Sequence, residues 1–198
     1  MKYAAETAFC LGIVVLSWHG MMAVHELGHV IGGLITGGRV TQVVLHPLQI
    51  SRTRIDPNPH PGTVVWLGPI TGCALPVLMA VLATGIVGRD ESDVSLRFRR
   101  IAGRFLWFFA GFCLVANGVY LVFGAADGVG DCGEILRTGT PAWVLYAFGS
   151  LTIPSGLLCW HRLGRITQLF ESPPQAARLL VVWVTVSVVF TLELWLSG

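Results

Sequence analysis

Two histidines and one glutamate stand within an otherwise apolar segment near the N-terminus, AVHELGHVIGG, from Ala23 to Gly33. On a helix, residues four apart project from the same face about one turn apart, so His25 and His29 can both reach a single ion. Glu26 lies next to His25, where its carboxylate can take a proton from a water molecule at that ion. The spacing is that of the HExxH motif, in which the histidines bind zinc and the glutamate is the general base.

Two considerations argue against an accidental HExxH match: its low frequency by chance, and the high cost of ionised side chains in a membrane. A chain with six histidines and six glutamates contains His-Glu-x-x-His about 0.005 times by chance. An ionised side chain at the centre of a bilayer costs roughly 2.5 to 3.5 kcal/mol, so an intramembrane glutamate between two histidines marks a functional site. We therefore expect His25 and His29 to bind a metal ion and Glu26 to be catalytic.

A third metal ligand must come from elsewhere in the chain, because catalytic zinc takes three protein ligands and keeps a fourth position for water. The other histidines are poorer candidates, since they stand in loops, at a helix end or two turns from Glu26: His46, His60, His161 and His19. The segment FGAADGVGDCGEIL offers Asp127 and Asp131, followed by a short helical pattern. For each aspartate the alternative is a solvated turn, because Asp-Gly is a common turn signal.

The composition places these groups in a membrane protein. The chain of 198 residues is 54% hydrophobic and only 12% charged, whereas about 25% of residues are charged in soluble domains. Five stretches approach the roughly 20 apolar residues that cross a bilayer. We predict an all-α polytopic membrane protein, one domain over residues 1–198, with helices at about 5–37, 63–88, 101–126, 139–162 and 177–197.

Two connections between these helices differ in character. The first, residues 39–56, is rich in Val, Ile and Thr and is followed by DPNPHPG, so it predicts a short β-strand insertion after the first helix. The second, residues 89–104, mixes acids with arginines and is expected to be a solvated loop without chemistry. After two more crossings the chain is back on the side where the first helix ends, which brings Asp127 and Asp131 to the side of His25 and His29.

Charge and cysteine content set further bounds. Nine Lys and Arg residues lie on the N-terminal side of the five crossings and four on the other, which favours a cytoplasmic N-terminus and places the metal-ligand end of the first helix outside. The net charge of +2 and the dispersed basic residues argue against a nucleic-acid partner. The five cysteines lack a CxxC spacing and are interpreted as small buried hydrophobic residues.

The stretch HELGHVIGGLITGGRV resembles the zinc helix and following turn of the site-2 protease family of intramembrane zinc metalloproteases, especially its compact bacterial-type members without a PDZ domain. The strand-like segment, WLGPITGCALP in the second crossing and the Asp motif before a later one also agree, so the resemblance covers roughly residues 18–150. It implies a Zn²⁺ cofactor and a carboxylate as third ligand. The stretch GDCGEIL is the nearer match to the compact members and favours Asp131 as this ligand. Many other members have an Asp-Gly motif, to which only Ala126-Asp127-Gly128 corresponds in this sequence.

The resemblance also implies an activity and a location. The protein would be an integral, multi-pass protein of a bacterial cell membrane that cleaves membrane-spanning or membrane-adjacent peptides, with zinc-activated water and Glu26 as base. Its site would be reached by water near the cytosolic face, opposite to the side that the charge count favours. Strands between Arg39 and Ile55 could pair with an unwound substrate or merely cap the site. Asn117 is a candidate substrate contact, the alternative being a bond to a neighbouring helix.

Two other classes of function compete with the protease. The first is a metal-binding membrane protein without peptidase activity that serves as a partner-binding or chaperone-like module. The intact Glu26 favours the enzyme, because retaining zinc does not require a general base. The second is a metal transporter, which ranks last because polar groups in the crossings are confined to Glu26, Asn117 and Glu193.

Overall fold

The computed structural model describes residues 2–48, 50–85, 93–163 and 176–197. Five helices in it are long and apolar enough to cross a membrane. A short helix, α4 (Asp131–Arg137), precedes the fourth of them. The five are α1 (Lys2–Ile35), α2 (Pro61–Gly85), α3 (Asp93–Asp127), α5 (Ala142–Leu163) and α6 (Ala176–Ser197). The predicted fold class, an all-α polytopic membrane protein with a strand insertion after the first helix, is confirmed.

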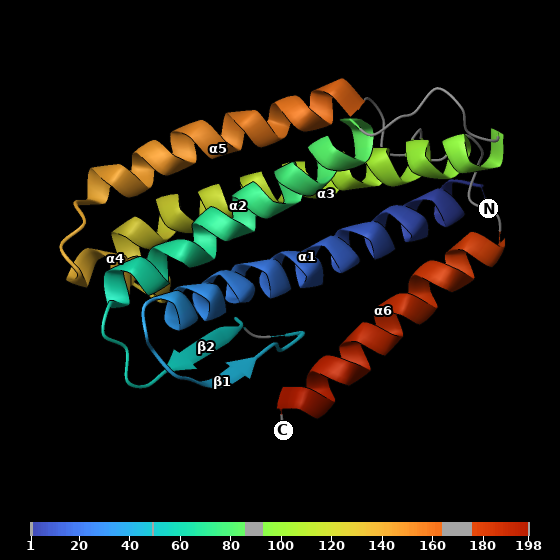
Figure 1. Cartoon of the computed structure of the whole chain (residues 1–198). Helices are drawn as coiled ribbons and strands as arrows, with labels where there is room; N and C mark the ends of the chain where they lie inside the picture. Colours follow the sequence, from blue (N-terminus) through green and yellow to red (C-terminus); the bar gives the residue numbers. More distant parts are fainter. Residues whose placement is uncertain (1, 49, 86–92, 164–175, 198) are drawn as a thin grey trace.

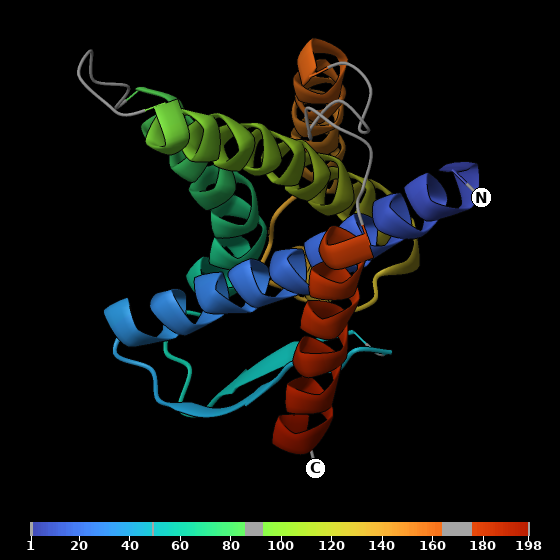
Figure 2. The same ribbon diagram turned by 90° about the vertical axis from the view of Figure 1, so that its right-hand side faces the viewer.

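Four of the long helices form a bundle, and the fifth stands at an angle to it. α3 packs along both α2 and α5, while α1 packs along α2. α6 crosses α1 obliquely and touches β1, as Figures 1 and 2 show. The metal-ligand end of α1, the start of α2, α4 and the hairpin all gather at one end of the bundle (Figure 1). The elements that carry the candidate ligands therefore share one end, as the order of crossings predicts.

The insertion is an antiparallel hairpin of β1 (Val40–Val44) and β2 (Arg52–Ile55) beside the last turns of α1 (Figure 1). Along β2, exposed side chains alternate with half-buried ones, as expected of a strand with one covered face. Ile55 faces α1, where it fills the space above Gly33. Arg52 and Arg54 lie on the opposite, exposed face.

The backbones of α1 and α2 approach closely where the histidines lie. A Cβ atom at Gly28 would overlap the carbonyl oxygen of Leu67, and one at Gly68 would overlap the imidazole of His29. Small residues permit such close helix packing in membranes. Gly68 therefore leaves on α2 the volume that the histidine ring occupies.

One predicted boundary needs correction. α3 begins at Asp93, eight residues before the predicted start, so residues 93–104 of the expected loop are helical; residues 89–92 lie outside the described part of the chain. A helix of 35 residues is about 52 Å long, well beyond a bilayer core of roughly 30 Å. Its start can thus lie outside the lipid, where arginine favours helix. The predicted end of the second helix, 86–88, also lies outside the described residues.

A buried polar pair joins α6 to α1. Nδ1 of His19 lies 2.7 Å from Oε2 of Glu193, and the two side chains are only 5% and 7% exposed. The contact is close but lacks hydrogen-bond geometry. Apolar packing of Phe9, Ile13 and Val182 supports it further along the same two helices. His19 therefore has a structural partner and does not join the histidines of the motif.

We expect His19→Ala to destabilise the protein by about 3 to 5 kcal/mol, because it leaves Glu193 buried without its partner. Replacing both residues by leucine should be nearly neutral, since the polar group that loses its partner is removed as well. Thermal unfolding in detergent micelles measures both effects. Equal destabilisation by the single and double variants would contradict a pairing role.

Candidate metal centre

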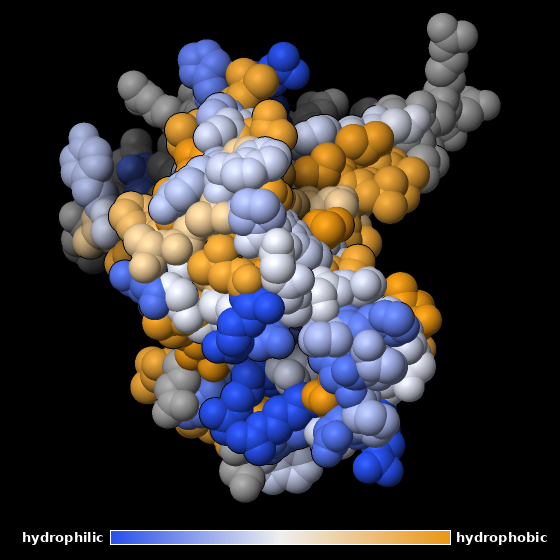
Figure 3. All heavy atoms as spheres, turned by 90° about the vertical axis from the view of Figure 1, so that its left-hand side faces the viewer, coloured by the Kyte–Doolittle hydropathy of each residue, from blue (hydrophilic) through white to orange (hydrophobic). Residues whose placement is uncertain are grey.

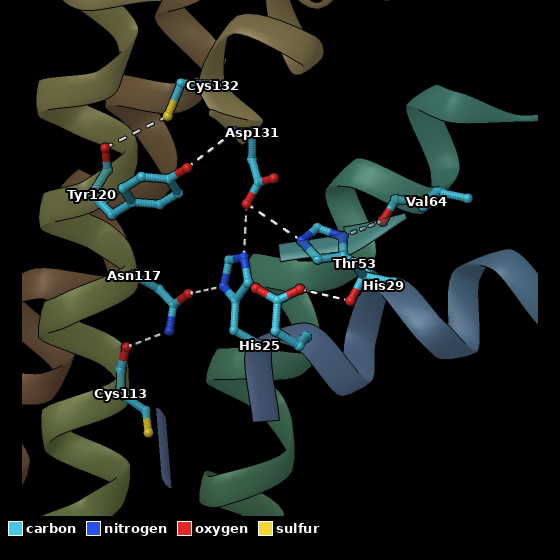
Figure 4. A network of polar contacts seen from close by, with 10 residues as sticks. His25, His29, Thr53, Val64, Cys113, Asn117, Tyr120, Asp131 and Cys132 are labelled. Carbon is cyan, nitrogen blue, oxygen red and sulfur yellow. Dashed lines mark hydrogen bonds and ion pairs between the residues drawn. The ribbon is translucent and has the colours of Figure 1, made fainter. Parts of the chain in front are cut away.

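Three side chains from two elements converge at the end of the bundle. Nε2 of His25 and Nε2 of His29 lie 2.7 Å and 3.3 Å from Oδ2 of Asp131 (Figure 4). One potential ligand atom from each residue lies within 4.8 Å of the other two. Asp127, the alternative third ligand, is exposed at the end of α3 and is not part of this group. The structure thus brings together the two histidines and the aspartate that the resemblance favours.

The turn between α3 and α4 places Asp131 at the histidines. Gly128 and Gly130 adopt φ values of 63° and 60°, which side chains with a Cβ rarely tolerate. Asp131 is the first residue of α4, and its backbone N–H donates to the Tyr120 hydroxyl oxygen at 2.9 Å. This bond satisfies one of the N–H groups that a helix start leaves without an internal partner. Tyr120 therefore anchors the backbone that carries Asp131.

Both imidazoles are held with Nε2 facing Asp131. Nδ1–H of His29 donates to the carbonyl oxygen of Val64 at 2.9 Å. Nδ1 of His25 lies 2.7 Å from Oδ1 of Asn117, whose Nδ2 donates in turn to the carbonyl of Cys113. Because a carbonyl only accepts, Nδ1 carries a proton in each ring, so Nε2 is the nitrogen left to bind a metal ion. Partners of this kind orient metal-binding histidines in known sites.

Asn117 has its polar atoms engaged within the protein. The side chain is 1% exposed, and both ends of its amide have partners on α1 and α3. Of the two alternatives left by the sequence, substrate contact or a bond to a neighbouring helix, the structure supplies the second. Asn117 thus positions the ring of His25.

Glu26 is buried beside the histidines and is held by the hairpin. It is 4% exposed, and Oγ1 of Thr53 on β2 donates to its Oε2 at 2.7 Å. One carboxylate oxygen is thereby fixed in direction. The hairpin thus orients the glutamate that the motif predicts to be the base.

The aspartate is held in its ionised form. Burial by itself would raise the pKa of Asp131, but the hydrogen bonds from His25 and His29 outweigh burial and hold that pKa well below its usual range. A metal ion bound here would displace the Nε2 protons, since metal binding releases protons from its ligands, and would meet one ionised carboxylate and two directed ring nitrogens. Two nitrogens and one oxygen also leave a position open in a tetrahedral site. The residues present therefore fit a metal ion with one open coordination position.

A cavity of about 1210 Å³ contains the centre. Its apolar lining includes Trp18, Met21 and Met22 of α1 and Val119 of α3. On the hairpin side it is lined by the consecutive residues Ser51 to Asp56. Figure 3 views the end of the molecule that carries the hairpin, and hydrophilic residues gather on its lower part. The centre thus has room for a peptide segment and faces both apolar and polar surroundings.

Two residues of the site, Tyr120 and Thr53, were not predicted from the sequence. Tyr120 lies three positions after Asn117 on α3, so both project from one helix face, and this spacing was an available signal. Thr53 belongs to the hairpin, whose sequence does not distinguish it from Thr41 on the other strand. Its role depends on the register of the hairpin and its docking on α1, which local sequence does not determine.

We expect His25→Ala, His29→Ala and Asp131→Ala each to lose bound metal, because two remaining ligands hold an ion far more weakly than three. Asp127→Ala is the matched control and should keep it. Elemental analysis of the purified proteins, after equilibration with a small excess of metal, measures the content. Retention of metal by Asp131→Ala, or its loss from Asp127→Ala, would rule out this ligand set.

Asn117→Ala should retain the site but weaken metal affinity by about 10- to 100-fold, as loss of a partner that orients a ligand does elsewhere. Asn58→Ala is the control, because Asn58 also lines the cavity but contacts neither histidine in the described structure. Competition with a chromogenic chelator gives the affinities. Equal affinities for the Asn117→Ala variant and the wild type would show that the bond to His25 does not matter.

Comparison with known proteins yields no match: no family model, no curated protein and no solved structure corresponds to the chain. The assignment of the site therefore rests on the motif and on the geometry of its side chains. What the structure establishes is a multi-pass membrane protein with a group able to bind a metal, formed by His25, His29 and Asp131.

Proposed function

We propose that this protein is an intramembrane zinc metalloendopeptidase related to the compact members of the site-2 protease family. The observation that carries the proposal is the convergence of three oriented ligands and a buried glutamate in one peptide-sized cavity. A site that only retained a metal would need the ligands but not Glu26. The HELGH sequence supplies two of the ligands and Glu26 on one helix.

The chain's own groups have distinct tasks in such a reaction. Bound zinc supplies Lewis acidity, which polarises the scissile carbonyl and lowers the pKa of water. Glu26 accepts the proton of the attacking water and then delivers it to the leaving amine, so that a single carboxylate acts first as base and then as acid. Thr53 keeps one oxygen of Glu26 in place, and Asn117 and Val64 keep the imidazoles directed at the ligand position.

The substrate would be an extended segment of a membrane-spanning or membrane-adjacent protein. Side chains of a strand alternate between its two faces, so a cavity against a face would touch every second residue. The cavity instead touches the consecutive residues Ser51 to Asp56, which indicates that the edge of β2 borders it. An unwound peptide can bind such an edge through backbone hydrogen bonds. A peptide added as a strand next to Glu26 would have its backbone carbonyls close to the metal centre.

The same resemblance supports a bacterial cell membrane as the location, with the lipid bilayer and membrane peptides as the partners. Water must reach the site from the end of the bundle that carries α4 and the hairpin, since the cavity is lined there by charged side chains, Arg54 and Arg137 among them. The count of basic residues favours the external side for this end. Single cysteines can be introduced into the hairpin and labelled in intact cells with a reagent that does not cross the membrane. Labelling would show whether the hairpin lies on the external or the cytosolic side.

We expect Glu26→Gln to abolish cleavage, with a loss of at least about 100-fold in kcat, while the bound metal is retained. Glutamine preserves the shape and the acceptor oxygen for Thr53 but cannot take up a proton. The measurement is cleavage of model membrane peptides by zinc-loaded protein in detergent, with elemental analysis of the same samples. Addition of a chelator should stop the wild type, and restoring zinc should recover it.

The outcome separates the protease from its main competitor, a metal-binding partner or chaperone-like protein. If the wild type holds metal but cleaves no membrane peptide, and Glu26→Gln behaves identically, the enzymatic proposal fails. If cleavage persists in the wild type after the chelator is added, and persists equally in the Glu26→Gln variant, the activity belongs to a contaminant.

A further inference from the structure

Two arginines of β2 border the cavity with their charges available. Arg52 and Arg54 are exposed and line the cavity, and within the described residues neither guanidinium has an ion-pair partner. The neighbouring arginine at the cavity, Arg137, differs in that its guanidinium is paired with Glu134. Arg39, at the base of the hairpin, donates to the carbonyl of Asp56. Thus two positive charges of one strand remain available to a ligand in the cavity.

The register of β2 relates these charges to the catalytic glutamate. Thr53, which binds Glu26, lies between Arg52 and Arg54 and points to the opposite face. In a peptide added to the edge of β2, the residue opposite Thr53 faces the metal centre. Its two neighbours share the face of the arginines, with Cβ atoms about 4.5 to 5.5 Å from theirs. The arginines therefore read the two positions that flank the residue at the site.

We propose that Arg52 and Arg54 select substrates with acidic residues at these two positions, in an acidic-x-acidic pattern. The inference rests on the proposed function and adds to it a chemical class of substrate. Opposite charges directly across two strands stabilise the pairing, and like charges destabilise it.

The test begins with a neutral membrane peptide that the wild type cleaves, whose cut site is mapped by mass spectrometry. A Glu-x-Glu pair is then moved along the peptide one position at a time, with Lys-x-Lys and Gln-x-Gln as matched series. In one register, kcat/KM for Glu-x-Glu should exceed that for Lys-x-Lys by about tenfold or more, as two cross-strand charge pairs imply. The ratio should fall as salt is raised, because exposed charges are screened. The same kcat/KM for both charges in every register would overturn the inference.

Charge exchange provides the second arm. The double variant Arg52→Glu/Arg54→Glu should prefer Lys-x-Lys at the same register, and this reversal cannot come from misfolding. Arg39→Glu is the control, because it makes one of the same charge reversals beside the same hairpin but outside the cavity lining, and it should keep the preference for Glu-x-Glu. If the double variant loses activity toward both peptides while keeping its metal and its unfolding temperature, the arginines do not read substrate charge.

Two conditions keep the result specific. Assays in zwitterionic detergent contain no anionic lipid, so a charge preference there belongs to the peptide; if the arginine variants differ from the wild type only in vesicles with anionic lipid, the arginines serve lipid headgroups and the inference fails. Binding of the fluorescent peptides to Glu26→Gln is measured in parallel by anisotropy. A charge preference in binding, without any cleavage by the wild type, would refute the protease but support charge selection. Cleavage without a charge preference would support the protease and refute charge selection.

Discussion

The contact of one carboxylate oxygen with two imidazoles is the interaction on which the architecture of this end of the protein depends. Oδ2 of Asp131 lies within 3.3 Å of Nε2 of both histidines. Polar groups at membrane depth are costly unless they are paired, and these three satisfy one another before any ion is added. The helix spacing of His25 and His29, the glycine turn before α4 and the anchor from Tyr120 all serve to bring this oxygen to its place.

α3 organises the surroundings of the centre although it provides no ligand itself. Asn117 and Tyr120, one turn apart, hold a histidine ring and the start of α4 respectively. α2 contributes by lacking side-chain volume, since Gly68 gives space to the ring of His29, and by offering the carbonyl of Val64. The site is thus built from three membrane helices, a hairpin and the short helix α4, and each of them positions identifiable groups. Such division makes the position of every functional atom depend on several packed elements.

Much of this arrangement follows from sequence reasoning, and the parts that do not have physical causes. The five apolar helices and the hairpin are predictable, because hydrophobic length and β-propensity are local properties. The two histidines follow from helix spacing, and the parity of the crossings brings Asp131 near them. The partners Thr53 and Glu193 are not predictable in this way, because each meets its counterpart through tertiary packing between segments distant in sequence. The early start of α3 was missed because charge was interpreted as a loop, whereas a helix longer than the bilayer also carries charge.

The long sequence separation of the paired polar groups has a consequence for how the protein is made. His25 and Asp131 are 106 residues apart, which corresponds to roughly 5 to 20 seconds of synthesis at ordinary translation rates. The contact of His19 forms later still, since its partner Glu193 lies in the last helix, α6. During that interval α1 resides in or near the bilayer with its polar side chains lacking their final partners. The nascent chain therefore completes the polar contacts of its first helix only as its later segments arrive, and assembly of the centre marks a late stage of biogenesis.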